Sequence, residues 1–300
     1  MTGREGGLRL DLFLSAALPE LSRKQAKRLI DARRVSVGGR IEPMASRVVR
    51  GGDEVEVVLE RAAPPAAPPE LPVLYEDAAC LAVDKPPGLP SGPTRDPARP
   101  HAAALAEARA GSPLTLLHRL DKETSGVLLL GKTPAFCVAL LTAFRQRRVE
   151  KIYLALVQGR PPGSFEVVSH LREGEGDRMV AVRAGGLRAD TRFRVLAHAP
   201  GHALVEASPR TGRTHQIRVQ LSQAGYPILG DGLYGGAAAT AGVAVPRQML
   251  HARALSFSHP GTGKALRIEA PVPEDFRQVA RTLFGSRLPA ALRAATRPAP

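Results

Sequence analysis

A stretch rich in proline and alanine divides the chain and limits the folds that are open to it. Residues 61–72 read RAAPPAAPPELP. Proline has no amide hydrogen and a fixed φ angle, so this stretch can neither continue a helix nor pair within a sheet, and it should act as a semi-rigid spacer. A chain of 300 residues is long enough for about two domains. The sequence therefore predicts a small domain over residues 1–60, the spacer over 61–72, a larger domain over 73–281 and a tail over 282–300.

The net charge narrows the class of partner. Lysine and arginine number 42 against 28 acidic residues, which gives a formal net charge of +14. Such a charge favours a polyanionic partner, and nucleic acid is the commonest one. A GC-rich genome would also enrich arginine, alanine, glycine and proline, so the charge alone leaves both explanations open.

The two cysteines, Cys80 and Cys137, are too few for a disulfide framework or a four-cysteine zinc site. Both lie in apolar runs, which predicts that they fill the core. No apolar run is long enough to cross a bilayer, and the N-terminus lacks the apolar segment of a secretion signal. We therefore expect a cytoplasmic protein.

The small domain combines a basic helix with short strands. Ser22 is a suitable N-cap for a helix over residues 23–33, in which Ala26, Leu29 and Ile30 share one face. Between Ser22 and Arg50 there are nine basic residues against two acidic ones. This excess favours contact with a phosphate backbone, although a solvated helix face explains it equally well. The candidate nucleic-acid-binding residues are Arg23, Lys24, Lys27 and Arg28.

The larger domain alternates strands and helices. The pattern predicts a buried strand over residues 78–84, a helix that starts at Thr133-Pro134 and ends near 147, and a strand over 149–157. It also predicts a strand pair around Pro200-Gly201 and a helix from a Thr214 cap to about Ala224. The region 89–114 gives no clear assignment.

The densest chemical signal is HRLDKETSG, residues 118–126. Asp121 lies between Arg119 and Lys122 on a polar turn, and the neighbouring cations should keep its carboxylate ionised. Such a carboxylate can serve as a nucleophile, a base or a metal ligand, or it can simply cap a turn. A serine-hydrolase triad of His118, Asp121 and Ser125 is disfavoured because three neighbours on one turn rarely form one.

A second cluster of polar residues follows the predicted strand pair. Arg210, Arg213, His215 and Arg218 lie on a loop and the first turn of the next helix. A helix N-terminus with added cations is a ready phosphate site. Phosphate binding explains Arg210 and Arg213 well, and for Arg218, one turn into the helix, a plain structural salt bridge is the alternative.

At these residues the sequence resembles a known family. HRLDKETSGVLLLGKT is similar to the catalytic motif of the RluA-type pseudouridine synthases, and EKIYLALVQG and SPRTGRTHQIRVQLSQAGYPILGDGLYG agree in order and distance. LAVDKPPGL and MLHARALSFSHP resemble the family's first core strand and its penultimate strand. Residues 9 to about 58 resemble the small RNA-binding domain named after ribosomal protein S-four. The resemblance covers most of the chain, and several motifs in sequence are hard to obtain by chance.

This resemblance implies a fold and a function. The fold is α+β, a pseudouridine synthase domain on a central mixed, largely antiparallel sheet, preceded by a small S-four-like domain. Asp121 corresponds to the catalytic aspartate, Tyr153 to a tyrosine that packs against the target base, and Arg218 to the arginine that pairs with the aspartate. Arg119 corresponds to an arginine that fills the space left when the base flips out; Arg210, Arg213 and His215 are further candidate RNA contacts.

The implied reaction is the isomerisation of uridine to pseudouridine in structured RNA. It needs no cofactor, and the sequence contains no Walker loop, dinucleotide fingerprint or metal-ligand spacing. We expect a monomer whose substrate is large-subunit ribosomal RNA, with transfer RNA as an alternative. Two other classes of protein are alternatives. The intact Asp121, Tyr153 and Arg218 argue against a non-catalytic RNA-binding ribosome-assembly factor, and no recognition helix is apparent for a DNA-binding regulator.

Three parts of the sequence depart from the family pattern. Gln220 stands where histidine is usual, a change that we expect to matter little. Arg33-Arg34 replace a common glycine, so the bend after the small domain's helix should differ. The region 89–114 diverges most, which leaves its RNA-facing detail open.

Overall fold

The computed structural model describes residues 7–19, 21–59, 69–176 and 178–293. The chain forms two compact units, Met1–Ala67 and Pro68–Pro300. Most of the predicted spacer lies outside the described residues, and Leu71 and Val73 already pack against the core of the second unit. In the described ranges, no helix has the length and apolar character needed to span a membrane.

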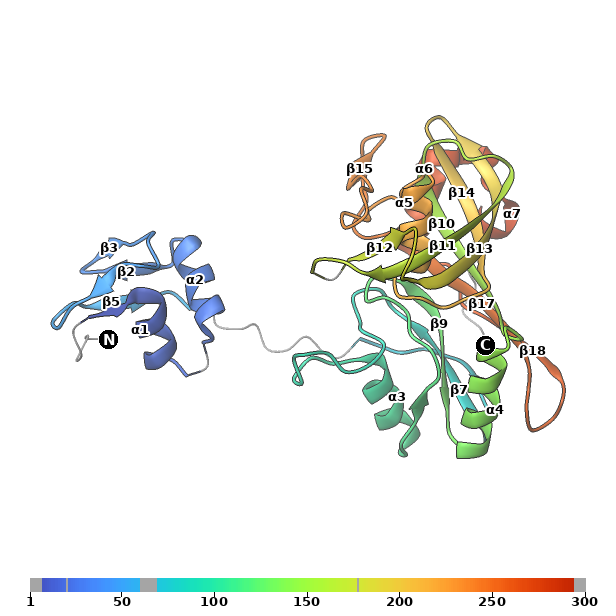
Figure 1. The fold of residues 1–300 in the computed structure, drawn as a ribbon, viewed down its shortest axis with the longest axis horizontal. Coiled ribbons are helices and arrows are strands. Elements are labelled where there is room, and N and C mark those ends of the chain that lie inside the picture. The colour runs from blue at the N-terminus through green and yellow to red at the C-terminus, as the bar shows by residue number, and fades with distance from the viewer. Residues whose placement is uncertain (1–6, 20, 60–68, 177, 294–300) are drawn as a thin grey trace. The chain divides into compact units, whose positions relative to one another are not determined.

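The first unit places two helices against short strands (Figure 1). The sheet order is β3-β2-β5, with β1 and β4 paired separately. The elements are β1 (Leu8–Arg9), α1 (Leu10–Ala17), α2 (Arg23–Asp31), β2 (Val35–Val37), β3 (Arg40–Ile41), β4 (Val48–Val49) and β5 (Val55–Val57).

Helix α2 begins where the sequence predicted. Ser22 and Gln25 form a reciprocal capping box, and Ala26 and Ile30 are fully buried in the core of the unit. The helix ends at Asp31, two residues before the predicted end, and Arg33 adopts a φ of +57°. The chain thus makes the glycine-like bend with an arginine.

The second unit is built on a mixed sheet of eleven strands. The order is β12-β11-β13-β14-β10-β17-β9-β7-β6, with β18 on β17 and β8 on β9. Every pairing is antiparallel except that of β17 with β9, which confirms the predicted mixed, largely antiparallel sheet. The strands are β6 (Val73–Glu76), β7 (Cys80–Lys85), β8 (Thr115–Leu116), β9 (Ser125–Gly131), β10 (Glu150–Gln158), β11 (Ser164–Glu173), β12 (Met179–Val182), β13 (Leu187–Ala199), β14 (His202–Pro209), β17 (Leu250–Ser258) and β18 (Ala265–Glu269).

The apolar run in β9 is explained by helices on both faces of the sheet. Val127 and Leu129 pack against α4 (Pro134–Arg145), while Leu128 and Leu130 pack against α3 (Ala102–Ala110), so all four side chains are buried (Figure 1). A strand covered on both faces reads as a continuous apolar run. Helix α3 also fills the region that the sequence left unassigned.

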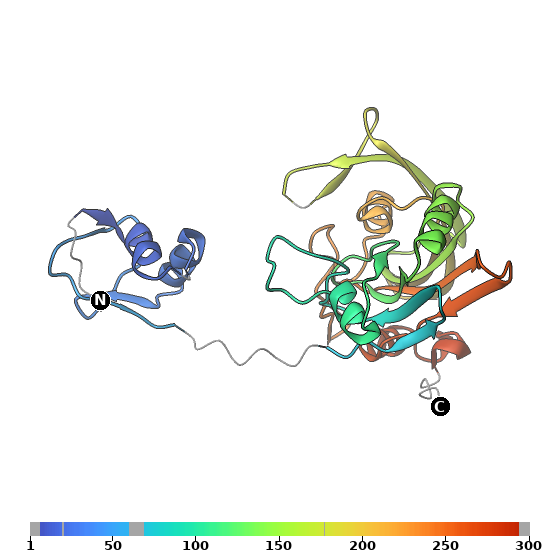
Figure 2. The ribbon, with the colours of Figure 1, turned by 90° about the horizontal axis from the view of Figure 1, so that it is seen from below.

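The other half of the sheet curves around α5 (Gln216–Gln223), as Figure 2 shows. Val219 of α5 packs with Leu171 of β11 and Ala189 of β13. The sequence predicted Thr214 as the N-cap of α5, and this prediction is wrong. His215 occupies the N-cap position and makes no side-chain cap bond. The short strands β15 (Ala239–Thr240) and β16 (Val243–Ala244) form a separate hairpin.

The C-terminal boundary lies later than predicted. Helix α6 (Glu274–Phe284) runs through residue 281, and a 3₁₀ turn (Gly285–Arg287) and α7 (Ala290–Arg293) follow. Phe284, Leu288 and Leu292 are buried in the largest core cluster. Residues as far as 292 therefore contribute to this core because their apolar side chains recur at positions that face it.

Candidate active site

Asp121 lies on the turn between β8 and β9, near the middle of the sheet. Its carbonyl oxygen accepts a hydrogen bond of 3.0 Å from the amide of Thr124. The residue before it is fixed by the buried Ser91, whose Oγ donates to the Leu120 carbonyl at 2.8 Å and accepts from the Leu120 amide at 2.9 Å. The backbone on the N-terminal side of Asp121 is therefore clamped by one hydroxyl.

Lys85 holds the other side of the turn from beneath. Its Nζ donates to the carbonyls of Pro86, Leu89 and Lys122 at 2.9, 2.8 and 3.0 Å, and the side chain is completely buried. Burial lowers the pKa of Lys85 to about 7, whereas three carbonyl acceptors match the three hydrogens of the ammonium form. The last residue of β7 and the loop that follows this strand thus hold the residues on both sides of Asp121.

Residues of the segment before β17 fasten the end of the turn. Arg247 donates to the Glu123 carbonyl at 3.1 Å, and Gln248 donates to Thr124 Oγ1 at 2.8 Å. The next residue that bends the chain, Gly126, has a φ of +113°, and a Cβ there would lie 2.1 Å from the Ala252 carbonyl oxygen. Only glycine lets β9 approach β17 this closely.

The carboxylate of Asp121 is anchored through one oxygen. Arg218 Nη1 donates to Oδ2 at 3.0 Å, and Arg218 itself is fixed by a bidentate pair with Asp231, at 2.7 Å from Nε and 2.8 Å from Nη2. Burial opposes the charge on Arg218, but hydrogen bonds and attraction from Asp231 and Asp121 outweigh it and raise its pKa. Among the described residues, Oδ1 of Asp121 has no hydrogen-bond partner, so this oxygen is open to a substrate.

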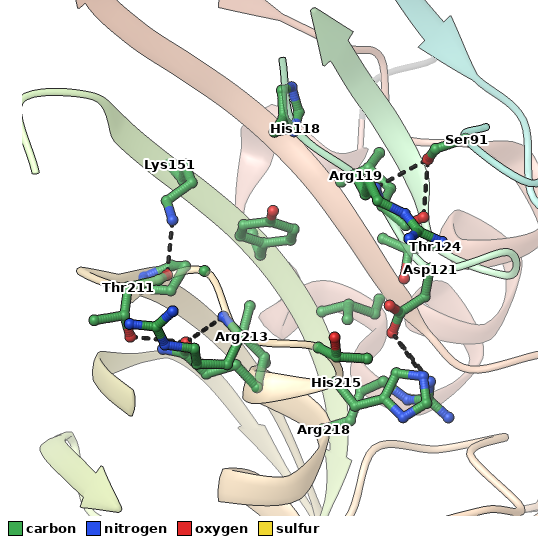
Figure 3. A pocket seen from close by; sticks show the side chains of 18 of the residues that line it. Ser91, His118, Arg119, Asp121, Thr124, Lys151, Thr211, Arg213, His215 and Arg218 are labelled. Carbon is green, nitrogen blue, oxygen red and sulfur yellow. Dashed lines mark hydrogen bonds and ion pairs between the residues drawn. The ribbon is translucent and has the colours of Figure 1, made fainter. Parts of the chain in front are cut away.

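The open oxygen faces a pocket of about 970 Å³ (Figure 3). Tyr153 on β10 lines this pocket, partly exposed, and its hydroxyl has no hydrogen-bond partner in the described part of the chain. Burial, and then the charge of Asp121, raise the pKa of Tyr153 and keep the phenol neutral. The ring is available as an apolar and stacking surface.

All seven residues that the sequence proposed for this unit line the same pocket: Arg119, Asp121, Tyr153, Arg210, Arg213, His215 and Arg218. Asp121 and Arg218 are 97 positions apart in sequence but in direct contact. Arg119 and Arg213 are exposed at the pocket, whereas the guanidinium of Arg210 pairs with Glu166 at 3.1 Å and Asp190 at 3.3 Å. Those carboxylates make Arg210 a weaker candidate for RNA than the sequence suggested.

The four candidates of the first unit lie on α2 and are exposed. Arg23 Nε pairs with the buried Asp11 at 2.9 Å, so part of its role is structural. Lys24, Lys27 and Arg28 make no ion pair with a described residue, which leaves their charges for a partner.

The residues that hold the site together were not predicted from the sequence: Lys85, Ser91, Lys151, Asp231, Arg247 and Gln248. Among these residues, only Lys85 gave a signal in the sequence, because it is a lysine at the end of an apolar strand. Ser91 and Gln248 look ordinary in sequence because their importance comes from contacts made across the fold.

Lys151 lies on the side of the pocket away from Asp121, next to Arg213 (Figure 3). Its Nζ donates to the Thr211 carbonyl at 2.7 Å, and burial, followed by the charge of Arg213, lowers its pKa to about 8. The cation is therefore present below pH 8 and lost as the pH rises through that value.

If Lys151 contacts RNA as a cation, RNA affinity should fall by up to about fourfold between about pH 7 and 8.5, because the protonated fraction of a lysine with a pKa of about 8 falls by that factor over this range. The dissociation constant measured at fixed salt checks this. The variant Lys151→Arg keeps its charge and should show a flat profile. An equally flat profile for the unaltered protein would remove Lys151 from the RNA contacts.

One group of potential metal ligands occurs among the described residues: Asp77, Cys80 and His259. The carboxylate of Asp77 accepts from Tyr75 and from the amides of Ala79 and Cys80. His259 Nδ1 accepts from the Gly261 amide at 3.2 Å, so Nε2 carries the ring hydrogen, 3.1 Å from Asp77. Burial raises the pKa of Cys80 to about 12. The Asp77 carboxylate is used within the fold and the Cys80 thiol stays protonated, while His259 Nε2 makes no hydrogen bond to a described residue and carries the ring hydrogen, so the three residues as they stand do not fit a metal ion.

The serine-hydrolase arrangement does not form either. His118 Nε2 accepts from the Leu129 amide at 3.0 Å, and burial lowers its pKa to about 4. Ser125 Oγ is 3.0 Å from Nδ1 of His251, which is buried with it. Neither residue is a partner of Asp121.

Two protein families match this chain, one for each unit. The model of the RNA pseudouridylate synthase family matches residues 79–223, and that of the S4 domain matches residues 8–55. A protein of Chloroflexus aurantiacus described as an uncharacterized RNA pseudouridine synthase is 37% identical over 92% of this chain and 90% of its own length. The ribosomal large subunit pseudouridine synthase C of Escherichia coli K12 is 36% identical, with 96% of each chain covered.

A solved structure shares the fold. The human RNA pseudouridylate synthase domain containing 4 superposes with a TM-score of 0.58 and 28% identity, over 71% of this chain and 92% of that one. This structural likeness and the match across almost the whole length of the bacterial sequences together assign both units to known families. The chain belongs to the RluA-type RNA pseudouridine synthases and carries an S4 domain ahead of its catalytic domain.

Proposed function

We propose that Asp121 is the catalytic residue and that it acts on a uridine flipped out of folded RNA. One observation supports this proposal. Arg218 fixes Oδ2 of Asp121, while Oδ1 has no hydrogen-bond partner among the described residues and faces the pocket. A carboxylate held by one oxygen keeps the other oriented toward the reacting atom, which is the main contribution a positioned side chain makes.

The reaction needs one well-placed carboxylate and no redox partner. The bond from ribose C1′ to uracil N1 breaks, the ring turns, and a bond from C1′ to C5 forms. The hydrogen on C5 leaves as a proton, and N1 gains one, so atoms and charge balance. Asp121 Oδ1 can start this by attacking C1′ or by removing a ribose proton; both routes use the same oxygen in its ionised form.

A uridine in a helix cannot reach Oδ1 without leaving the stack. Arg119, two residues before Asp121, is exposed and has no ion-pair partner among the described residues, so its guanidinium can occupy the vacated position. Tyr153 offers a ring for the extruded base. Both lie on the same pocket as Asp121.

We infer that the substrate is large-subunit ribosomal RNA. The support is the E. coli relative, whose name states that substrate class and whose length is covered almost entirely. We propose that the enzyme acts in the cytoplasm as a monomer, on RNA bound by both the S4 domain and the catalytic pocket.

Release of tritium from RNA labelled at C5 of uracil tests the substrate. Transcripts of large-subunit ribosomal RNA should release tritium, and transfer RNA transcripts should release little. Release from transfer RNA alone would move the substrate to that class. Binding without release from any RNA would favour the non-catalytic assembly factor.

The S4 domain should supply phosphate contacts through α2. Replacing Lys24, Lys27 and Arg28 by glutamine should weaken RNA binding and reduce the slope of log affinity against log salt by about 2 to 3, because each lost phosphate contact removes about 0.7 to 0.9. Titrations at several salt concentrations measure this. Arg194→Gln, which removes an exposed arginine already paired with Glu206, is the control. An unchanged slope in the triple variant would exclude α2 from the RNA contacts.

A further inference from the structure

His215 has an unfavourable backbone conformation for a residue with a side chain. Its φ is +53°, at the N-cap of α5, and its side chain makes no cap bond. Gln216 serves the start of the helix instead, because its Oε1 accepts from the Arg213 amide at 3.0 Å and from Thr211 Oγ1 at 2.7 Å. The formation of α5 therefore does not explain a histidine here, and a strained position that persists points to a use for the side chain.

The ring of His215 bridges Asp121 and Tyr234. Nε2 lies 3.9 Å from Asp121 Oδ2, the oxygen that Arg218 also holds. Nδ1 lies 2.8 Å from the hydroxyl oxygen of Tyr234, with the two rings edge to face at 5.6 Å. Figure 3 shows Asp121, His215 and Arg218 converging at one side of the pocket.

Tyr234 is itself fixed from several directions. Its hydroxyl oxygen accepts from the Met179 amide at 2.8 Å, at the first residue of β12. The guanidinium carbons of Arg218 and Arg178 lie 5.0 and 5.7 Å from its ring centre, and the side chain is buried. Tyr234 is therefore a rigid support that connects the edge strand of the sheet with the site.

These contacts select one arrangement of hydrogens. The Tyr234 oxygen already accepts from Met179, so its own hydrogen can be donated to His215 Nδ1. Nε2 then carries the ring hydrogen on the side of Asp121 Oδ2, at 3.9 Å, a separation at which the attraction is electrostatic and not a hydrogen bond. In the opposite tautomer a nitrogen lone pair would face the carboxylate, which is repulsive.

We propose that His215 and Tyr234 are positioning residues for Asp121. Tyr234 fixes the tautomer and orientation of His215, and His215 holds Oδ2 beside Arg218 so that Oδ1 stays turned toward the RNA. This role differs from the RNA contact that the sequence suggested for His215, and it rests on the proposal that Asp121 is the reacting residue.

The variant His215→Gly separates positioning from folding and from RNA binding. Glycine accepts the positive φ, which offsets the loss of the contacts with Tyr234, so the melting temperature should change little, while kcat should fall about tenfold or more because Oδ2 loses a neighbour. The dissociation constant for RNA should stay within about twofold. Ala241→Gly, which relieves a φ of +48° at an exposed turn outside the pocket, is the matched control and should leave kcat unchanged.

The variant Tyr234→Phe tests the link between the two residues. It keeps the ring and removes the hydroxyl, so kcat should fall to a similar extent, and the double variant should be no slower than His215→Gly alone. Three results would each overturn this positioning role: an unchanged kcat in His215→Gly, a loss confined to RNA affinity, or additive losses of kcat in the double variant. Failure of this positioning role leaves the proposed function intact, since tritium release and the variant Asp121→Asn test that function independently.

Discussion

The variant Asp121→Asn should lose at least about 10⁴-fold in kcat, because removal of a residue that reacts directly costs several orders of magnitude. Asparagine has nearly the same shape, and its amide oxygen can still accept from Arg218 Nη1, so the fold and the RNA dissociation constant should stay almost unchanged. Single-turnover tritium release, together with RNA binding measured separately, checks both halves of this expectation.

Glu123→Gln is the control for this variant, because it removes the same charge two residues away on the same turn. The carboxylate of Glu123 is paired only with Lys122, at 3.3 Å, within the described residues. Its kcat should change by less than about threefold, since an exposed pair of this kind contributes little. If the two variants lost activity equally, net charge at the turn would matter and the identity of Asp121 would not.

The second large effect is on stability and follows from the buried pair of Arg218 and Asp231. Arg218→Met should lower the free energy of unfolding by about 3–5 kcal/mol, because it leaves the Asp231 carboxylate buried without its partner. Asp231 is 3% exposed and Arg218 is 8% exposed, so water cannot replace the lost contacts. It should also reduce kcat by on the order of 10²-fold, since Asp121 loses its anchor. Urea unfolding and tritium release measure the two effects.

The double variant Arg218→Met, Asp231→Leu separates these two losses. With both charges gone, no buried charge is left unpaired, so most of the stability should return. Activity should not return, because nothing then holds Asp121 Oδ2. Recovery of activity together with stability would mean that Arg218 matters to the reaction only by keeping the domain folded.

The parts of the fold that the sequence predicted are those set by local patterns. The capping residues Ser22 and Thr133 mark the starts of α2 and α4. The region 89–114 could not be assigned, because α3 is a short alanine-rich helix whose packing against β9 decides its structure. The end of the core was missed for a related reason: Leu288 and Leu292 are recognised only from what they contact.

The residues of the candidate site fall into the same two groups, those that local motifs predict and those that only the fold reveals. Asp121, Tyr153 and Arg218 could be proposed because motifs carry them, and the structure brings them to one pocket. The supports of Asp121 could not be proposed, since Ser91 and Lys85 act through backbone atoms of Leu120 and Lys122 that lie 29 and 37 positions away. Gln220, expected to matter little, is buried and bonds to Thr191 and to the Val167 carbonyl, which gives it a structural role of its own.

A structure of the enzyme bound to substrate RNA with 5-fluorouridine at the target position tests the role of Asp121 most directly. The last step of the reaction releases the hydrogen on C5 as a proton. With fluorine at C5 there is no such proton to release, so the reaction should stop with the nucleotide in the pocket. We expect the base outside its helix against Tyr153, with ribose C1′ or C2′ within about 3.5 Å of Asp121 Oδ1 or bonded to it. A uridine still stacked in the RNA helix, or a ribose that approaches another residue while Oδ1 remains unoccupied, would contradict the mechanism.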